Sequence, residues 1–163
     1  MYSALHYKRT LGEIKSNMNM DKDRSFWILI SVASVLVLMF LAGQTLGVFN
    51  YDLAVSIGMQ ESESEIGKIG IAFAKGFGFA DTLIYIPLFL IGIIGLFKNK
   101  RWGKYSMFGA LAISVYWPIV HLYAIFIDRI SITLNPEKYI SYPIILSLII
   151  IYGLWGMRYL YKK

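Results

Sequence analysis

Four long apolar runs, separated by polar segments, organise this chain of 163 residues. A helix needs ~20 apolar residues to cross the ~30 Å hydrocarbon core of a bilayer, and each run is about that long. We therefore predict an all-α integral membrane protein, in which a leader at 1–25 precedes a single four-span domain at 26–163. The predicted spans are residues 26–48, 79–97, 105–127 and 139–159.

The long connection at 49–77 carries a further helical pattern. Ser62 and Glu65 have the spacing of a capping box, in which each satisfies a free backbone N–H group of the other. The apolar residues that follow at helical spacing are Ile66, Ile69, Phe73 and Phe77. This pattern predicts an amphipathic helix at about 62–77, lying on the membrane or over the mouth of the bundle. Gly76 and Gly78 would loosen the backbone after it and serve as the hinge of a lid.

Basic residues predict the orientation of the spans. The leader holds five Lys or Arg residues, the second connection four and the tail three, whereas the first and third connections hold two each. Because positive residues stay in the cytoplasm, both termini are predicted to be cytoplasmic and 49–77 extracytoplasmic. The second connection is short, so its helices are antiparallel neighbours. We thus expect an antiparallel four-helix bundle in the cell membrane, with the amphipathic helix in its first extracytoplasmic loop.

Composition supports this assignment and excludes several classes of function. Hydrophobic residues make up 57% of the chain and charged residues 16%, against about 25% in soluble domains. The net charge of +6 comes from residues that flank apolar runs, so it does not predict a nucleic-acid partner. The absence of cysteine excludes disulfides, thiolate metal sites and thiol redox chemistry. The motifs of phosphate-binding loops, zinc hydrolases and serine hydrolases are absent, and we expect neither metal nor cofactor.

Polar and aromatic side chains gather in the outer third of the predicted bundle. Counting depth at ~1.5 Å per residue places six of them there, as candidate ligand-binding residues. They are Gln44, Asp81, Tyr85, Trp117, His121 and Tyr142. Small residues occupy the inner half, where they would let helices approach closely. Pro87 and Pro118 each interrupt a helix and free a backbone carbonyl four residues earlier.

Each candidate has a plain structural alternative. Asp81 would cap a helix N-terminus, where an acid suits the positive end of the dipole. His121 would be a satisfied buried histidine, and the tyrosines and tryptophans would belong to an interfacial aromatic belt. However, ionisable residues inside membrane spans are costly and point to function. If Asp81 and His121 meet, burial and pairing would make them a proton-linked or catalytic site.

Three functions remain open on these grounds. The first is binding or moving a small amphipathic or lipid-like molecule in a pocket open to the outer leaflet. The second is a non-catalytic accessory subunit that docks to a membrane complex through its small-residue face. The third, an enzyme acting on a lipid or quinone with Asp81 and His121 as acid and base, is the weaker alternative, so catalysis is not expected. A homodimer is a reasonable expectation for any of them.

In span number, size and the side of its termini, the chain resembles small four-span families such as the DoxX-like proteins. The resemblance includes no residue motif, so it implies no function, cofactor or site.

Overall fold

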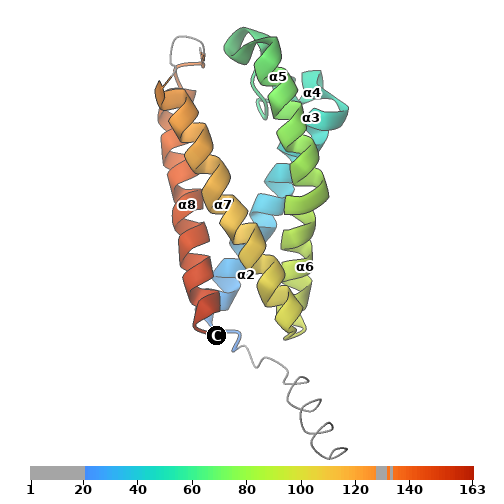
Figure 1. The fold of residues 1–163 in the computed structure, drawn as a ribbon, viewed down its shortest axis with the longest axis vertical. Helices are drawn as coiled ribbons and strands as arrows, with labels where there is room; N and C mark the ends of the chain where they lie inside the picture. Colours follow the sequence, from blue (N-terminus) through green and yellow to red (C-terminus); the bar gives the residue numbers. More distant parts are fainter. Residues whose placement is uncertain (1–20, 128–131, 133) are drawn as a thin grey trace, which may run out of the picture.

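Helices and short connections make up the part of the chain that the computed structural model describes, which is residues 21–127, 132 and 134–163 (Figure 1). Most of the predicted leader therefore lies outside the described residues. Two of the long helices contain a π-helical segment, labelled η, at which the α-helical hydrogen-bond pattern widens by one residue. The elements are α2 (Arg24–Phe40), η1 (Leu41–Thr45), α3 (Leu46–Phe49), α4 (Tyr51–Ser56), α5 (Glu63–Ala80), η2 (Asp81–Tyr85), α6 (Ile86–Phe97), α7 (Arg101–Ile127) and α8 (Lys138–Tyr161).

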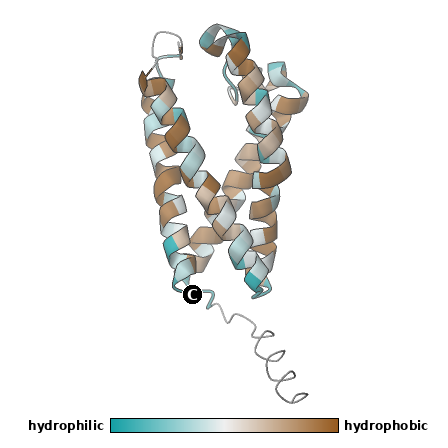
Figure 2. Ribbon diagram, viewed as in Figure 1, coloured by the Kyte–Doolittle hydropathy of each residue, from teal (hydrophilic) through white to brown (hydrophobic). Residues whose placement is uncertain are grey.

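In the part of the chain that the structure describes, four helices are long and apolar enough to cross a membrane, as a multi-pass membrane protein requires. They cover Arg24–Phe49, Glu63–Phe97, Arg101–Ile127 and Lys138–Tyr161. Large apolar side chains such as Leu38, Phe49 and Ile69 are exposed on them, which suits lipid as solvent rather than water. Figure 2 shows hydrophobic residues along the whole length of the helices. The four predicted apolar helices are confirmed.

The residues predicted to form a helix in the first long connection are helical, but they do not form a separate loop helix. Residues 63–80 continue through η2 into α6 as a helix of 35 residues. At ~1.5 Å per residue this helix is about 50 Å long, so its first turns extend well beyond a ~30 Å hydrocarbon core. The capping box that begins it is confirmed, since the Ser62 backbone N–H donates to the Glu65 carboxylate at 2.8 Å.

The hinge glycines differ from expectation. Gly76 and Gly78 have helical backbone within α5, whereas Gly67 leaves the helical region with φ 67° and ψ 173°. A Cβ at Gly78 would lie only 2.8 Å from the Gln44 carbonyl oxygen, so this glycine permits close packing of α5 on η1. The kink in this helix is therefore at Gly67, where only glycine adopts such angles without strain.

Small residues hold the helices together at the end where α2 begins and α8 ends, which we call the terminal end. A Cβ at Gly95 of α6 would lie 2.3 Å from the Gly103 Cα of α7, so the two backbones are in contact there. Gly92, Gly153 and Gly156 likewise pack against α7 or α2. These four glycines are thus occupied by contacts within the chain, whereas the small residues Ser31 and Ala112 are exposed.

The opposite end is called here the loop end, and it contains α4 and the first turns of α5 and α8. In Figure 1, α7 lies beside α8 at the loop end and leans away from α5, while its other end lies against α6. The buried core follows this arrangement and is richest toward the terminal end and the middle. Its fully buried large side chains include Phe26, Leu29, Tyr85, Phe89, Leu96, Met107, Leu111 and Leu160.

Candidate functional site

Two π-helical segments face each other, η1 in the last third of the first long helix and η2 near the middle of the second. The Thr45 hydroxyl of η1 hydrogen-bonds the Thr82 hydroxyl of η2 at 2.9 Å, and the Thr82 hydroxyl also bonds the Gly78 carbonyl at 2.7 Å. Pro87 has no N–H for the carbonyl of Leu83, so the sequence explains why regular α-helix fails at η2. Single π-helical turns occur frequently at functional sites.

Asp81 opens η2 and is half-buried. It has no hydrogen bond or ion pair to any residue that the structure describes, and the expected helix-capping role is excluded because α5 continues through it. Its charge interacts with Tyr85, one turn further along the same helix. Tyr85 is almost completely buried, and its hydroxyl shares a 2.5 Å hydrogen bond with Ser114 of α7.

A row of aromatic rings connects η2 with α8. Phe40 of α2 lies edge-on between Tyr85 and Trp117, with ring centroids 4.7 Å and 5.7 Å away. Trp117 contacts His121 one turn along α7, and the His121 ring centre lies 5.5 Å from that of Tyr142 on α8. Four of the six predicted site residues therefore lie in one continuous row, with Phe40 as a member that the sequence did not suggest.

Glu61, and not Asp81, is the acid that acts on His121. The charge of Glu61 interacts with His121, whereas no interaction joins His121 to Asp81 within the described structure. Tyr142 donates a hydrogen bond to the Glu61 carboxylate. The Tyr51 hydroxyl donates to the Glu61 carbonyl at 2.9 Å, and burial together with the charge of Glu61 raises the pKa of Tyr51 to about 12. The predicted pairing of Asp81 and His121 is replaced by a Glu61–Tyr142–His121 cluster.

The end of the connection between α4 and α5, together with the first turn of α5, bridges the two sides of the loop end. We call these residues, 59–66, the strap. Glu65 accepts hydrogen bonds from Lys138 Nζ at 2.9 Å and from the Asn135 backbone N–H at 3.2 Å, next to its bond with Ser62. On the other side, the buried Gln60 amide donates to the Gly43 carbonyl at 3.3 Å and to Gln44 at 3.4 Å. The strap thus ties α8 to η1 and to the start of α5.

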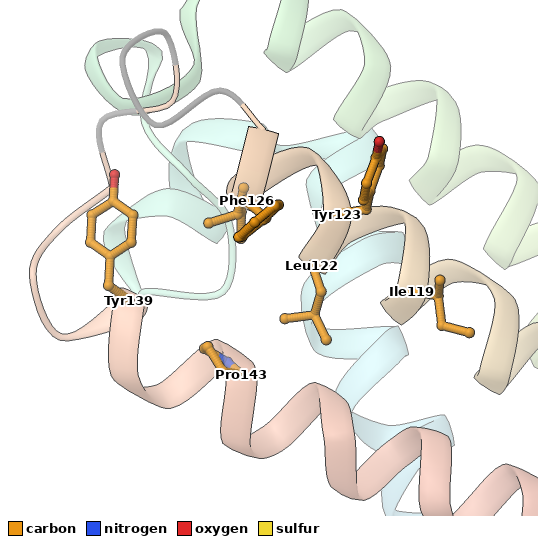
Figure 3. A pocket seen from close by; sticks show the side chains of 7 residues that line it. Ile119, Leu122, Tyr123, Phe126, Tyr139 and Pro143 are labelled. Carbon is orange, nitrogen blue, oxygen red and sulfur yellow. The ribbon is translucent and has the colours of Figure 1, made fainter.

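An open apolar cavity of about 560 Å³ lies between α7 and α8 at the loop end (Figure 3). Figure 3 shows Leu122 and Phe126 of α7 opposite Tyr139 and Pro143 of α8. None of the six predicted ligand-binding residues lines it. However, Leu122 and Pro143 are the immediate sequence neighbours of His121 and Tyr142. Its lining consists of Ile119, Leu122, Tyr123, Ile125, Phe126, Tyr139 and Pro143.

The site differs from its prediction mainly in residues that sequence reasoning missed. Glu61 and Gln60 lie just before the capping box, and nothing local distinguishes them from solvated polar residues. Thr45 and Thr82 give only a weak signal, because threonine is common in membrane helices. The proline at 87 was the available indication of an unusual helical turn at η2.

The chemistry available is binding and proton exchange, with carboxylates, hydroxyls, one imidazole and an apolar cavity. Among the described residues, no group of three or more His, Cys, Asp or Glu side chains could hold a metal ion. Comparisons with known proteins add no relative: no family model, no curated protein and no solved structure matches this chain.

Proposed function

We propose that this chain is a multi-pass protein of the cell membrane that binds, and in its cycle moves, a small amphipathic or lipid-like molecule at the loop end of α7 and α8. The cavity between these helices carries the proposal. Its volume of about 560 Å³ is within the range of ~300–1,000 Å³ typical of small-molecule sites. Its walls are aliphatic and aromatic, with the hydroxyls of Tyr123 and Tyr139 as the polar groups of its lining side chains.

The neighbourhood of the cavity suits a molecule with a polar group and an apolar tail. Glu61, Tyr142 and His121 form a polar cluster, in which His121 and Tyr142 are the sequence neighbours of the cavity residues Leu122 and Pro143. An apolar tail would lie against Leu122 and Phe126, and the polar group would reach the cluster. By charge distribution the loop end faces the outside, so entry would be from the outer leaflet.

The remaining predicted residues contribute differently to this proposal. Trp117 joins the cluster to the middle of the chain through its contact with His121. Gln44, Asp81 and Tyr85 lie on the side of the π-helical segments, across Phe40 from Trp117. They would act on the ligand only indirectly. The lid would be the strap, which lies between Gly58 and Gly67, both with positive φ.

Photolabelling tests the cavity. The purified protein would be placed in nanodiscs with a lysophospholipid or fatty acid that carries a diazirine on its acyl chain. We expect label on peptides 119–126 and 139–143, competed by unlabelled lipid. Leu122→Trp would fill the cavity and reduce the competed labelling at least about fivefold, because a filled cavity leaves no volume for the tail.

A matched control keeps the result specific. Ile145→Trp adds the same volume on the exposed face of α8, outside the cavity lining, and should leave labelling unchanged. Labelling that is spread evenly over the lipid-facing residues, or that both variants reduce equally, would show general lipid contact instead of a site. Replacing His121 with Ala separates the polar cluster from the tail, since it should weaken binding of charged lipids more than of neutral ones.

A further inference from the structure

Asp81 is an ionisable residue to which the described residues give no partner. It is half-buried in the middle of a long apolar helix and makes no hydrogen bond or ion pair to the described residues. The group that its charge affects is the neutral phenol of Tyr85. An isolated ionised carboxylate in hydrocarbon costs several kcal/mol, so something must neutralise this group.

Oxygen atoms from both π-helical segments gather around Thr82, the residue that follows Asp81. The hydroxyls of Thr45 and Thr82 are 2.9 Å apart, and Thr82 reaches the Gly78 carbonyl at 2.7 Å. From the other side, the Gln44 carbonyl and side-chain oxygens approach Gly78, with 2.8 Å and 3.3 Å to a Cβ placed there. Carboxylate, hydroxyl and carbonyl oxygens are the ligands that hard cations prefer.

The described residues place no basic side chain against Asp81. The elements packed against η2 are η1, α5 and α6, together with Phe40 of α2 and Ser114 of α7, which contact Tyr85. Neither η1 nor α6 contains a titratable residue, the Lys and Arg residues of α2 and α7 are in their first turns at the terminal end, and no interaction joins His121 to Asp81. The nearest basic residue along the helix is Lys75, whose Nζ lies 5.4 Å from the centre of the Tyr51 ring. A single carboxylate is neutralised by a single positive charge. We propose that Asp81 and the facing π-helical segments form a binding site for a monovalent cation, either Na⁺ or a proton.

This proposal is independent of the α7–α8 cavity, because it depends on different helices. It is tested by the thermal unfolding of the full chain in nanodiscs, with choline chloride keeping the ionic strength constant. A ligand bound by the folded state raises the melting temperature with the logarithm of its concentration. For Na⁺ we expect a rise of about 5 °C at a hundredfold excess over Kd, and none in Asp81→Asn.

Threonine variants distinguish the two cations. Thr45→Val and Thr82→Val remove hydroxyl ligands, so each should raise the half-saturating Na⁺ concentration about tenfold if Na⁺ is bound. If the proton is bound, Na⁺ has no effect, and the native protein gains stability as the pH falls by a margin that Asp81→Asn lacks. Asp52→Asn, a change at an exposed acid of α4, is the control and should behave like the native protein.

The opposing outcome is equally clear. If Asp81→Asn changes the melting temperature by one constant amount at every Na⁺ concentration and every pH, the carboxylate binds neither cation and the proposal is overturned. If Asp81→Asn does not fold, the native protein still decides the outcome. A native melting temperature that Na⁺ leaves unchanged and that does not rise as the pH falls would also overturn the proposal.

Discussion

Tyr85 and Ser114 share a buried hydrogen bond of 2.5 Å that joins the second long helix to the third. The Ser114 hydroxyl also donates to the Ala110 carbonyl of its own helix at 3.0 Å, so Tyr85 is the donor to Ser114. Ser114 is also the residue whose backbone carbonyl lacks a helical N–H donor because of Pro118. The Tyr85 ring packs against the Phe40 ring. The Tyr85–Ser114 bond is a buried polar contact between the helix that holds Asp81 and the helix that holds His121.

Replacing Tyr85 with Phe should destabilise the protein by about 0.5–1.5 kcal/mol, since one buried hydrogen bond is lost while the ring packing remains. Ser114 keeps its bond to Ala110, so no hydroxyl is left without a partner. Reversible unfolding in mixed micelles measures the change. In Ser114→Ala the same bond is lost, and the double variant should cost little more than either single one. Strictly additive costs would show that the two hydroxyls do not stabilise each other.

Gly95 and Gly103 should tolerate no side chain. An added Cβ at either position would lie 2.3–2.4 Å from backbone carbon atoms of the facing helix, well inside van der Waals contact. We expect Gly103→Ala to cost more than about 2 kcal/mol, because α6 and α7 must separate. Gly76→Ala is the matched control: its added Cβ would meet nothing within 4 Å, and alanine favours helix by up to about 1 kcal/mol. Equal effects at both glycines would contradict the packing described.

The charge pattern predicts that both termini are cytoplasmic, and fusion reporters can test this. A C-terminal green fluorescent protein should fluoresce, and alkaline phosphatase fused after Ser56 should be active, because that position would lie outside. Reversing the charges at Lys98, Lys100 and Arg101 to Glu should weaken this preference and lower both signals. Phosphatase activity at the C-terminus of the native chain would reverse the proposed orientation.

The sequence predicted the long helices well because the apolar runs and their flanking charges are local signals. Capping at Ser62 was equally readable, since the cap forms within three residues. The sequence did not predict that residues 62–77 continue into the second span. Gly76 and Gly78 suggested a break, but their role depends on which atoms of η1 lie opposite, and that is a tertiary property.

The candidate site was predicted in part for the same reason. Depth counting found Trp117, His121 and Tyr142 because helical rise fixes depth along each span. It paired His121 with Asp81 because both are at a similar depth. Which groups meet also depends on the direction in which each side chain points around its helix axis. The strap then brings Glu61 to His121 and Tyr142, and the path of this loop cannot be predicted from sequence periodicity. Counting depth along the helices therefore cannot predict site residues that come from the loops at the helix ends.

Lys138 and Glu65 should hold the strap against α8. Their salt bridge is largely shielded, with side chains 17% and 9% exposed, so it exceeds an ordinary surface pair. Lys138→Met leaves the Glu65 carboxylate with the backbone N–H groups of Asn135 and Ser62. We expect faster hydrogen exchange in 59–66, by about tenfold, with exchange at the terminal end unchanged. Lys68→Met changes an exposed lysine at the same end and is the control. Equal exchange in both variants would show that the salt bridge does not hold the strap against α8.

Gly67 should be the position on which the strap depends. Its backbone, at φ 67° and ψ 173°, is accessible to glycine and strained for other residues. A Cβ there meets no atom within 4 Å, so any cost of Gly67→Ala comes from the backbone and not from a clash. We expect destabilisation by about 1–3 kcal/mol, or a straightened helix that pulls Glu65 away from Lys138. Distances between spin labels at Ser64 and Ser141 would separate these results.

A longer and broader distance distribution in Gly67→Ala would show that the kink keeps the strap closed. An unchanged distance with lower stability would show strain without movement. Gly76→Ala, which lies in the same helix with helical backbone, should change neither quantity. If Gly67→Ala behaves like Gly76→Ala in both measurements, the kink has no role in positioning the strap, and the lid in the proposed binding cycle would have to be a different segment.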